Sequence, residues 1–288
     1  MIQIDRLTKA FDGRTVLDDV TLTIEEGKTT ALIGRSGSGK SVLMKHIIGL
    51  LKPDTGRVLV DGEDIGAVDY ARLRVIRRQF GVLFQGGALF DSMSVLENVA
   101  FPLRTFTKMG PGEVKDRAEE CLRQVKLSDA AARKPSEISG GMQKRAALAR
   151  AIALEPRYVI YDEPTSGLDP QTSNTIDELI RSLADELNIT SIVVTHDMHS
   201  VLSIADRAAF LHEGQLRWVG TVDDLHRATD EVLLGFVKAN EYQIGNPSAT
   251  AIAAATPPFA PPASAPPASA PAVGAPPVFS PDPLPATP

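Results

Sequence analysis

The chain has 288 residues, of which 43% are hydrophobic and 23% charged, the composition of a globular protein with a substantial core. Its formal net charge of −6 and its pI of about 5.5 give no support to a nucleic-acid partner held by a basic surface. The single cysteine, Cys121, excludes an intrachain disulfide and fits a reducing compartment. Because it falls within a helical pattern, we expect a packed rather than a reactive thiol.

No segment of the sequence is typical of a membrane span or of a secretory signal. A run of about 18 apolar residues, the length that suggests a membrane-spanning helix, does not occur. Residues 1–6 lack the basic region and the apolar region that open a signal peptide. We therefore expect a cytoplasmic protein, which partners must hold at a membrane if it works there.

The first 33 residues alternate between apolar and polar positions as β-strands do, with turns at Asp12-Gly13 and at 26–28. Phe11 lies in the loop after the first predicted strand, where an aromatic ring could stack on an adenine. A phenylalanine that packs within the core or the loop is an equal alternative. Residues 29–33 form a β-branched and apolar run, which predicts a buried strand.

A glycine-rich loop follows directly, because residues 34–41 fit the pattern G-x-x-x-x-G-K-[ST]. The apolar stretch 42–51 after it is helical in pattern, so a helix N-terminus would face any phosphate in the loop. Lys40 is predicted to reach the β- and γ-phosphates of a nucleotide, and Ser41 to bind Mg²⁺. The alternative is a glycine turn with an incidental lysine. The predicted nucleotide-binding residues here are Gly34, Arg35, Ser36, Gly37, Ser38, Gly39, Lys40, Ser41 and Val42.

Gln85 ends a predicted apolar strand at 80–84. A strand at 57–60 and a basic helix at 70–78 precede it. A glutamine at the end of a strand and beside two glycines could bind Mg²⁺ and also hinge the segment that follows. An exposed glutamine taken alone indicates nothing.

Residues 88 to about 155 change to a helical pattern, with helices expected at 95–103, 112–125 and 143–154. Ser139 is predicted to cap the last of these helices, and Gly140 and Gly141 free the backbone beside it. A second helix N-terminus with free N–H groups and a hydroxyl predicts a second phosphate site. An ordinary capped helix is the alternative.

An acidic pair ends the next predicted strand, 158–161. Asp162 is expected to hold Mg²⁺ through water, and Glu163 to polarise the water that attacks a γ-phosphate. An acidic pair that simply starts a loop is the alternative. Asp169 lies in the turn that follows, and His196 ends a further strand at 189–195, where it could contact the γ-phosphate or be structural.

The C-terminal part begins with strands at 207–211 and 216–219 and a helical stretch at 222–239. Its composition then changes, since 14 of the last 42 residues, 247–288, are proline and 13 are alanine. Such a segment cannot form a packed core, so we expect a disordered, partly polyproline-II tail. A spacer and a ligand for an SH3-like domain are both compatible with it.

Taken together, these motifs resemble the ATP-binding subunits of ABC transporters over residues 1–240. The glycine-rich loop, Gln85, the Ser139-Gly140-Gly141 signature, the acidic pair and His196 occur in that family's order. The resemblance implies an α/β fold with a P-loop NTPase core of ABC type. It also implies an antiparallel β subdomain and an α-helical subdomain inserted at about 88–155. The composition assigns residues 241–288 to a Pro/Ala-rich, disordered tail.

The resemblance further implies the cofactors ATP and Mg²⁺ and a head-to-tail dimer of two copies. The signature of one copy would close over the ATP that the other copy holds, with Asp169 reaching across. Phe11 would stand where the family has its adenine-stacking aromatic. The catalytic residues would be Lys40, Glu163 and His196, and the Mg²⁺ ligands Ser41, Gln85 and Asp162.

Met142 stands where glutamine is usual in the signature. Through this methionine and the stretch 83–104, the chain resembles the ATPases of Mla/MCE-type lipid transport systems. This implies phospholipid transport across a bacterial envelope, from the cytoplasmic face of the inner membrane. The partners would be an integral-membrane permease, an MCE-domain protein and a small regulatory subunit. The permease would dock on 85–104, where Leu89, Phe90 and Met93 are expected to be exposed.

Two other functions remain open at this point. The first is the ATPase of an importer of polar solutes, such as amino acids or ions, which would pair with a soluble binding protein. The second is a non-transport ABC protein of translation or DNA maintenance, although the chain has neither a second cassette nor long coiled coils.

Overall fold

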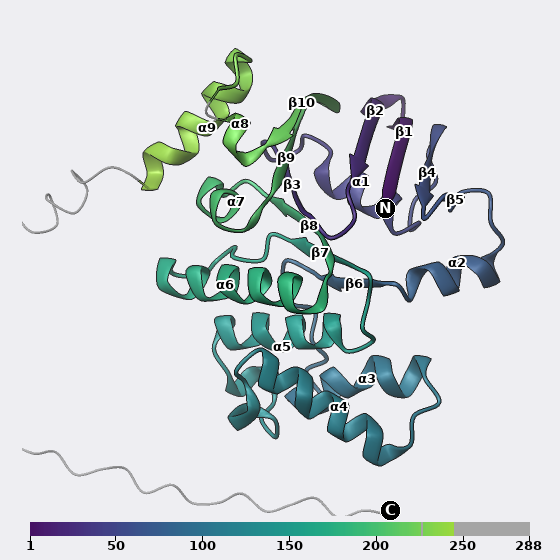
Figure 1. Cartoon of the computed structure of the whole chain (residues 1–288), viewed down its shortest axis with the longest axis vertical. Coiled ribbons are helices and arrows are strands. Elements are labelled where there is room, and N and C mark those ends of the chain that lie inside the picture. The colour runs from purple at the N-terminus through teal and green to yellow at the C-terminus, as the bar shows by residue number, and fades with distance from the viewer. Residues whose placement is uncertain (226, 245–288) are drawn as a thin grey trace, which may run out of the picture. The chain divides into compact units, whose positions relative to one another are not determined.

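A computed structural model describes residues 1–225 and 227–244. Its centre is a six-stranded sheet in the order β10-β9-β3-β8-β7-β6, parallel except for β10 (Figure 1). Strands β3 and β8 are buried on both faces, which explains their unbroken apolar and β-branched sequences. The strands are β3 (Thr29–Ile33), β6 (Phe80–Leu83), β7 (Tyr158–Asp162), β8 (Thr190–Thr195), β9 (Arg207–His212) and β10 (Gln215–Thr221).

A second, antiparallel sheet has the order β2-β1-β4-β5. Helix α1 (Lys40–Ile47) packs between the two sheets, because Leu43, Met44 and Ile47 belong to a buried cluster with side chains of both. Its position places the loop before α1 at the carboxyl end of β3. The four strands are β1 (Ile2–Phe11), β2 (Arg14–Ile24), β4 (Thr55–Val60) and β5 (Glu63–Asp64).

The chain between β6 and β7 is helical (Figure 1). Ser94 and Glu97 form a capping box at the start of α3, and Ser139 caps α5 as predicted. Cys121 is fully buried, which confirms the packed thiol, and burial raises its pKa to about 11. The elements are α3 (Val95–Phe106), α4 (Pro111–Gln124), α5 (Gly140–Ile152) and the short 3₁₀ helices Ser128–Ala130 and Pro135–Glu137; α2 (Tyr70–Arg77) precedes β6.

The prediction of one continuous helical stretch over 222–239 is wrong. The stretch consists of α8 (Val222–Leu225) and α9 (Glu231–Ile244), with Asp230 between them. The Asp230 carboxylate accepts a hydrogen bond from the Leu233 amide at 2.8 Å and pairs with Arg217, so a new helix begins there. Helix α6 is Pro170–Leu187, and the short α7 (Met198–Ile204) was not predicted.

The predicted combination of an α/β core, an antiparallel sheet and a helical segment is therefore present. The boundaries proposed for the subdomains stay predictions, and the expected tail at 247–288 lies outside the described residues. None of the helices in residues 1–225 and 227–244 is long and apolar enough to cross a membrane.

Candidate functional site

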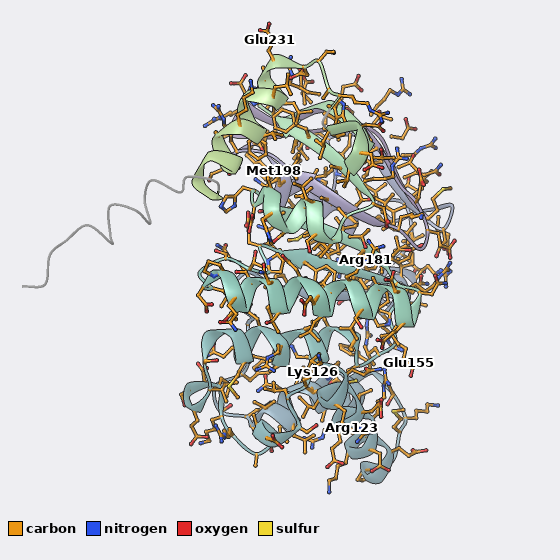
Figure 2. The ribbon with its side chains drawn as sticks, turned by 60° about the vertical axis from the view of Figure 1, so that its left-hand side comes forward. Arg123, Lys126, Glu155, Arg181, Met198 and Glu231 are labelled. Carbon is orange, nitrogen blue, oxygen red and sulfur yellow. The ribbon has the colours of Figure 1, made fainter. Side chains whose placement is uncertain are left out.

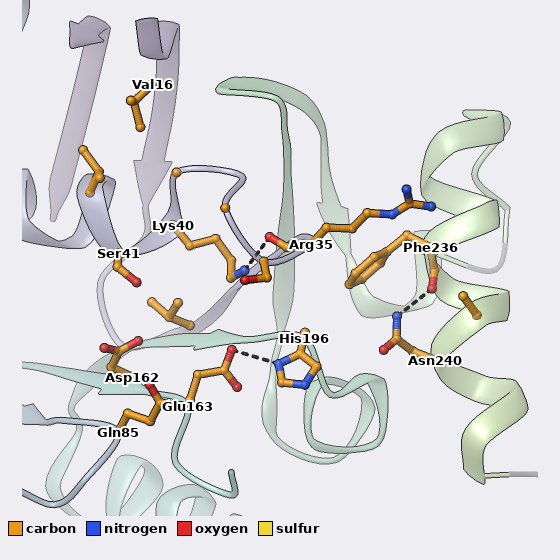
Figure 3. Close-up of a pocket in the computed structure, with 16 residues that line it drawn as sticks. Val16, Arg35, Lys40, Ser41, Gln85, Asp162, Glu163, His196, Phe236 and Asn240 are labelled. Carbon is orange, nitrogen blue, oxygen red and sulfur yellow. Dashed lines mark hydrogen bonds and ion pairs between the residues drawn. The ribbon is translucent and has the colours of Figure 1, made fainter. Parts of the chain in front are cut away.

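A cavity of about 620 Å³ opens at the carboxyl ends of β3, β6, β7 and β8 (Figure 3). Parallel strands place the loops that follow them at one sheet edge, which is where α/β proteins bind ligands. The structure thus brings together eleven of the predicted residues from four separate stretches of sequence. They are Arg35, Ser36, Gly37, Gly39, Lys40, Ser41, Val42, Gln85, Asp162, Glu163 and His196.

The glycine-rich loop wraps one end of this cavity. Gly39 precedes α1 with a φ of +106°, and a Cβ there would lie 2.9 Å from the Val16 carbonyl oxygen, so only glycine fits without strain. Lys40 Nζ donates to the carbonyl oxygen of Gly34 at 2.7 Å. It also donates to the carbonyl oxygen of Arg35 at 3.1 Å (Figure 3). Burial lowers the pKa of Lys40, and Glu163 and Asp162 oppose this shift.

The acidic pair forms the opposite wall. Burial, and then the neighbouring Glu163, raise the pKa of Asp162, while Lys40 and Lys144 lower it. Glu163 Oε1 lies 2.9 Å from Nδ1 of His196, so these two side chains from adjacent strands meet at the cavity (Figure 3). A carboxylate held by an imidazole and facing a phosphate-sized space is suited to accept a proton from water.

The residues predicted to bind Mg²⁺ share this cavity. The Ser41 hydroxyl, the Gln85 amide and the Asp162 carboxylate all line it, and oxygen ligands of this kind suit Mg²⁺. Burial, and then Glu163, raise the pKa of Asp162, and a bound divalent cation would favour its charged form. The donor set therefore fits the ion.

Some predicted residues do not line the cavity. Phe11 is 40% exposed with the Lys9 ammonium 5.3 Å from its ring centre, while Val16, on the neighbouring strand, does line it. Asp169 caps α6, where its carboxylate accepts from the Thr172 amide at 3.0 Å. The other predicted residues outside the lining are Gly34, Ser38, Ser139, Gly140 and Gly141.

The two signature glycines have different surroundings. Gly140 is exposed, and a Cβ there would meet no atom closer than 3.7 Å. Gly141 is buried, and a Cβ there would lie 2.4 Å from the Thr172 methyl carbon on α6. Gly141 is thus needed for packing within the subunit, whereas no contact in the part of the chain that the structure describes requires glycine at 140.

Five lining residues escaped the sequence reasoning: Val16, Val194, Phe236, Ala239 and Asn240. The last three belong to α9, where Asn240 Nδ2 donates to the Phe236 carbonyl oxygen at 2.8 Å (Figure 3). The helical pattern was visible in the sequence, but nothing local in it indicates that α9 reaches the cavity. The spacing of Phe236 and Asn240, one helical turn apart, indicates only that the two residues share one face of the helix.

A buried carboxylate lies behind the acidic pair, on the face of α6 that packs against α7. Figure 2 shows the two helices side by side, with Arg181 on α6 and Met198 at the start of α7. Asp177 is fully buried, and neither of its carboxylate oxygens has a hydrogen-bond partner in the described part of the chain. Burial raises its pKa from 3.8 to about 6, while the nearby Ser200 hydroxyl partly opposes this.

We expect Asp177→Asn to stabilise the protein at pH 8. The folded-state pKa is raised, so stability is lost as pH rises from about 4 to 6, and the full penalty of about 3 kcal/mol remains above pH 6. Urea unfolding should show a free energy of unfolding higher by about 1–3 kcal/mol at pH 8, with the gain shrinking below pH 6. Asp185→Asn, an exposed change on the same helix, is the control, and an equal gain there would contradict the explanation.

Comparison with known proteins agrees with this geometry. A sequence model of the ABC transporter family matches residues 17–166. The intermembrane phospholipid transport system ATP-binding protein MlaF of Haemophilus influenzae is 42% identical over 238 residues, which are 83% of this chain and 90% of that protein. The probable ribonucleotide transport ATP-binding protein mkl of Mycobacterium tuberculosis H37Rv is 41% identical over 82% of this chain and 66% of that protein.

Among solved structures, the dimeric cassette MJ0796 in a post-hydrolysis state bound to ADP and Pi has a TM-score of 0.71. It is 34% identical, and the match covers 77% of this chain and 99% of that one. The predicted fold class is thereby confirmed, and the cofactors ATP and Mg²⁺ agree with both the comparisons and the donor set of the cavity. The chain belongs to the ABC transporter family, as an ATP-binding subunit that hydrolyses ATP.

Proposed function

We propose that this chain is the ATPase of a phospholipid transport system in a bacterial envelope. The cavity at the carboxyl end of the sheet, with Lys40, Asp162, Glu163 and His196 on its walls, supports ATP hydrolysis. The identity with MlaF over 83% of the chain favours a lipid cargo over a polar solute. The chain would lie at the cytoplasmic face of the inner membrane and be held there by a permease.

In this proposal each wall of the cavity has a separate task. The backbone of the glycine-rich loop and the N-terminus of α1 bind the phosphates, and Lys40 exchanges its carbonyl partners for phosphate oxygens. Ser41, Gln85 and Asp162 would hold Mg²⁺, which neutralises charge on the phosphates when bound. Glu163 takes a proton from the attacking water, while His196 fixes the carboxylate through its Nδ1.

The signature residues support a site shared between two copies. Ser139 and Gly140 are exposed and lie outside the cavity of their own chain, so their predicted phosphate contacts require a second subunit. MJ0796 is itself a dimer. A head-to-tail pair would place each signature over the nucleotide of the other copy, with Asp169 near the crossing point.

A groove of about 550 Å³ between α2, β6, α3 and α5 supports permease docking. Phe90, on the loop after Gln85, is 42% exposed and packs against Phe101 in it. The buried Asn98 side chain shapes this loop by accepting from the Phe90 amide and donating to three carbonyl oxygens. The expectation that Leu89 and Met93 are exposed was wrong, since both are half-buried and Leu89 packs against the core.

We expect Phe90→Asp to release the permease. The groove is lined by aromatic rings and also by Arg74, Arg77, Arg78 and Arg150. Replacing the exposed Phe90 ring by a carboxylate removes its apolar contact with a membrane-protein helix, so recovery of the permease should fall about tenfold or more. Affinity purification from detergent-solubilised membranes measures this, while nucleotide affinity of the purified subunit should stay unchanged. Val219→Asp, at an exposed apolar position on β10, is the control and should retain the permease.

The same purification with the unmodified chain tests the proposed function. Mass spectrometry of the proteins and lipids should find a permease, an MCE-domain protein, a small regulatory subunit and bound phospholipid. A soluble solute-binding protein without lipid would favour a polar-solute importer. Co-sedimentation with ribosomes or RNA would instead support a non-transport role.

A further inference from the structure

Lys144 is a buried cation of α5 that has no part in the steps above. It lies one turn after the signature glycines and is 6% exposed. Its Nζ donates to two main-chain carbonyl oxygens, that of Gln85 and, at 3.1 Å, that of Glu163. One ammonium group thus joins the helix that follows the signature, the Gln85 loop and the residue that carries the proposed base.

The backbone of Glu163 needs such support. Its φ is +48°, a left-handed conformation that is strained for a non-glycine residue and persists only where the surroundings impose it. The Glu163 amide donates to the Val194 carbonyl oxygen at 2.8 Å, and its carbonyl accepts from the Ser166 amide and from Lys144. Lys144 therefore completes the set of bonds that holds the peptide groups on both sides of the base.

The Gln85 loop is held in the same way. The Gln85 carbonyl accepts from Lys144, and its side-chain amide donates to Ser166 Oγ at 3.5 Å. The Ser166 main-chain amide in turn donates to the Glu163 carbonyl oxygen at 3.2 Å. A small network of hydrogen bonds thus joins the Gln85 loop to Glu163. Arg150, also on α5, holds the same loop through the Gly87 and Ala88 carbonyl oxygens, both at 2.8 Å, but Lys144 bonds both Gln85 and Glu163.

We propose that Lys144 is a positioning residue for ATP hydrolysis, which fixes the Gln85 loop and Glu163 relative to each other and links both to the signature helix. This inference rests on the proposed role of Glu163. When the signature meets the nucleotide of the second copy, any movement of α5 would shift Lys144 and, through its hydrogen bond, the main-chain carbonyl group of Glu163. Lys144 itself contacts neither nucleotide nor water in this scheme.

The test compares Lys144→Met with Lys144→Arg in the full-length chain. Methionine keeps the length of the side chain without a donor, so kcat for ATP should fall about 10- to 100-fold through misplacement of the base. Binding of the fluorescent analogue trinitrophenyl-ATP should stay as in the unmodified chain. Arginine retains two N–H donors and should recover most of kcat. A wild-type kcat in Lys144→Met would overturn the proposal.

Arg117→Met is the matched control. Arg117 is also a largely buried cation that donates to two carbonyl oxygens of the chain at the end of α5, those of Ile152 and Ala153, both at 3.3 Å. Its loss should lower the melting temperature and leave kcat unchanged. An equal loss of kcat in both variants would show a general effect of α5 packing and overturn the proposal.

Two further measurements keep the result decisive. If Lys144→Met does not fold, Lys144→Leu, which also lacks a donor, replaces it, and a lowered kcat at unchanged analogue affinity supports the proposal while a wild-type kcat overturns it. Glu163→Gln is assayed alongside. A wild-type rate of hydrolysis in Glu163→Gln would show that Glu163 is not the base, which would overturn both proposals. An inactive Glu163→Gln together with a wild-type kcat in Lys144→Met would overturn the role of Lys144 and leave that of Glu163 in place.

Discussion

Replacing Glu163 by glutamine should lower ATP hydrolysis by about 10²- to 10⁴-fold, the usual contribution of a general base. The amide cannot take a proton from water, but it keeps the shape of the side chain and a hydrogen-bonding group for His196. ATP binding should therefore be intact. Because the γ-phosphate is no longer removed, the dimer that ATP holds together should persist.

Single-turnover hydrolysis and size-exclusion chromatography in Mg²⁺-ATP measure the two effects. His196→Ala is the companion variant, since it removes the partner 2.9 Å from the carboxylate and leaves the base itself in place. Its loss of kcat should be smaller than that of Glu163→Gln. Steady-state hydrolysis near the wild-type rate in Glu163→Gln would exclude Glu163 as the base.

The second large effect is expected at Gly140, where an aspartate should abolish hydrolysis without harming the fold. No contact within residues 1–225 and 227–244 requires glycine here, so the melting temperature and the nucleotide affinity of the isolated subunit should not change. In the dimer, the added carboxylate would face the phosphates of the second copy. We expect kcat to fall about 100-fold or more, because displacement of reacting groups by about 1 Å has effects of this size.

Mixing two inactive variants provides the decisive control for this shared site. A dimer of one Gly140→Asp chain and one Lys40→Ala chain has one site with both defects and one site with neither. Activity should reappear on mixing, although each variant alone is inactive. Gly141→Ala is a contrasting variant that should already be less stable as a single subunit, because its Cβ would collide with Thr172. No recovery on mixing would argue against sites built from two copies.

The parts of this protein that sequence could predict are those in which local chemistry determines position. The glycine-rich loop follows a strand and precedes a helix, so Lys40 and Ser41 could be placed at the carboxyl end of β3, where they line the cavity. The strand ends that carry Asp162 and His196 follow from apolar runs, because parallel strands end at a common edge. The helix cap Ser139 was likewise readable as a local signal.

The missed features depend on contacts between distant segments. Asp177 falls within the buried stripe of α6, beside Ile176 and Ile180, and a carboxylate at that phase of the helix was a visible anomaly. Lys144 gave no such signal, since its partners come from two other loops and are main-chain atoms. The break at Asp230 escaped notice because apolar residues continue on both sides of it.

The buried thiol of Cys121 makes this protein convenient for site-specific labelling. With a pKa near 11 and no exposed surface, its thiolate is scarce at neutral pH and out of reach of maleimide reagents. The native cysteine can therefore remain in place while a single new cysteine is added at an exposed position. A pair of probes on two copies would then report how far apart the subunits stand before, during and after each turnover.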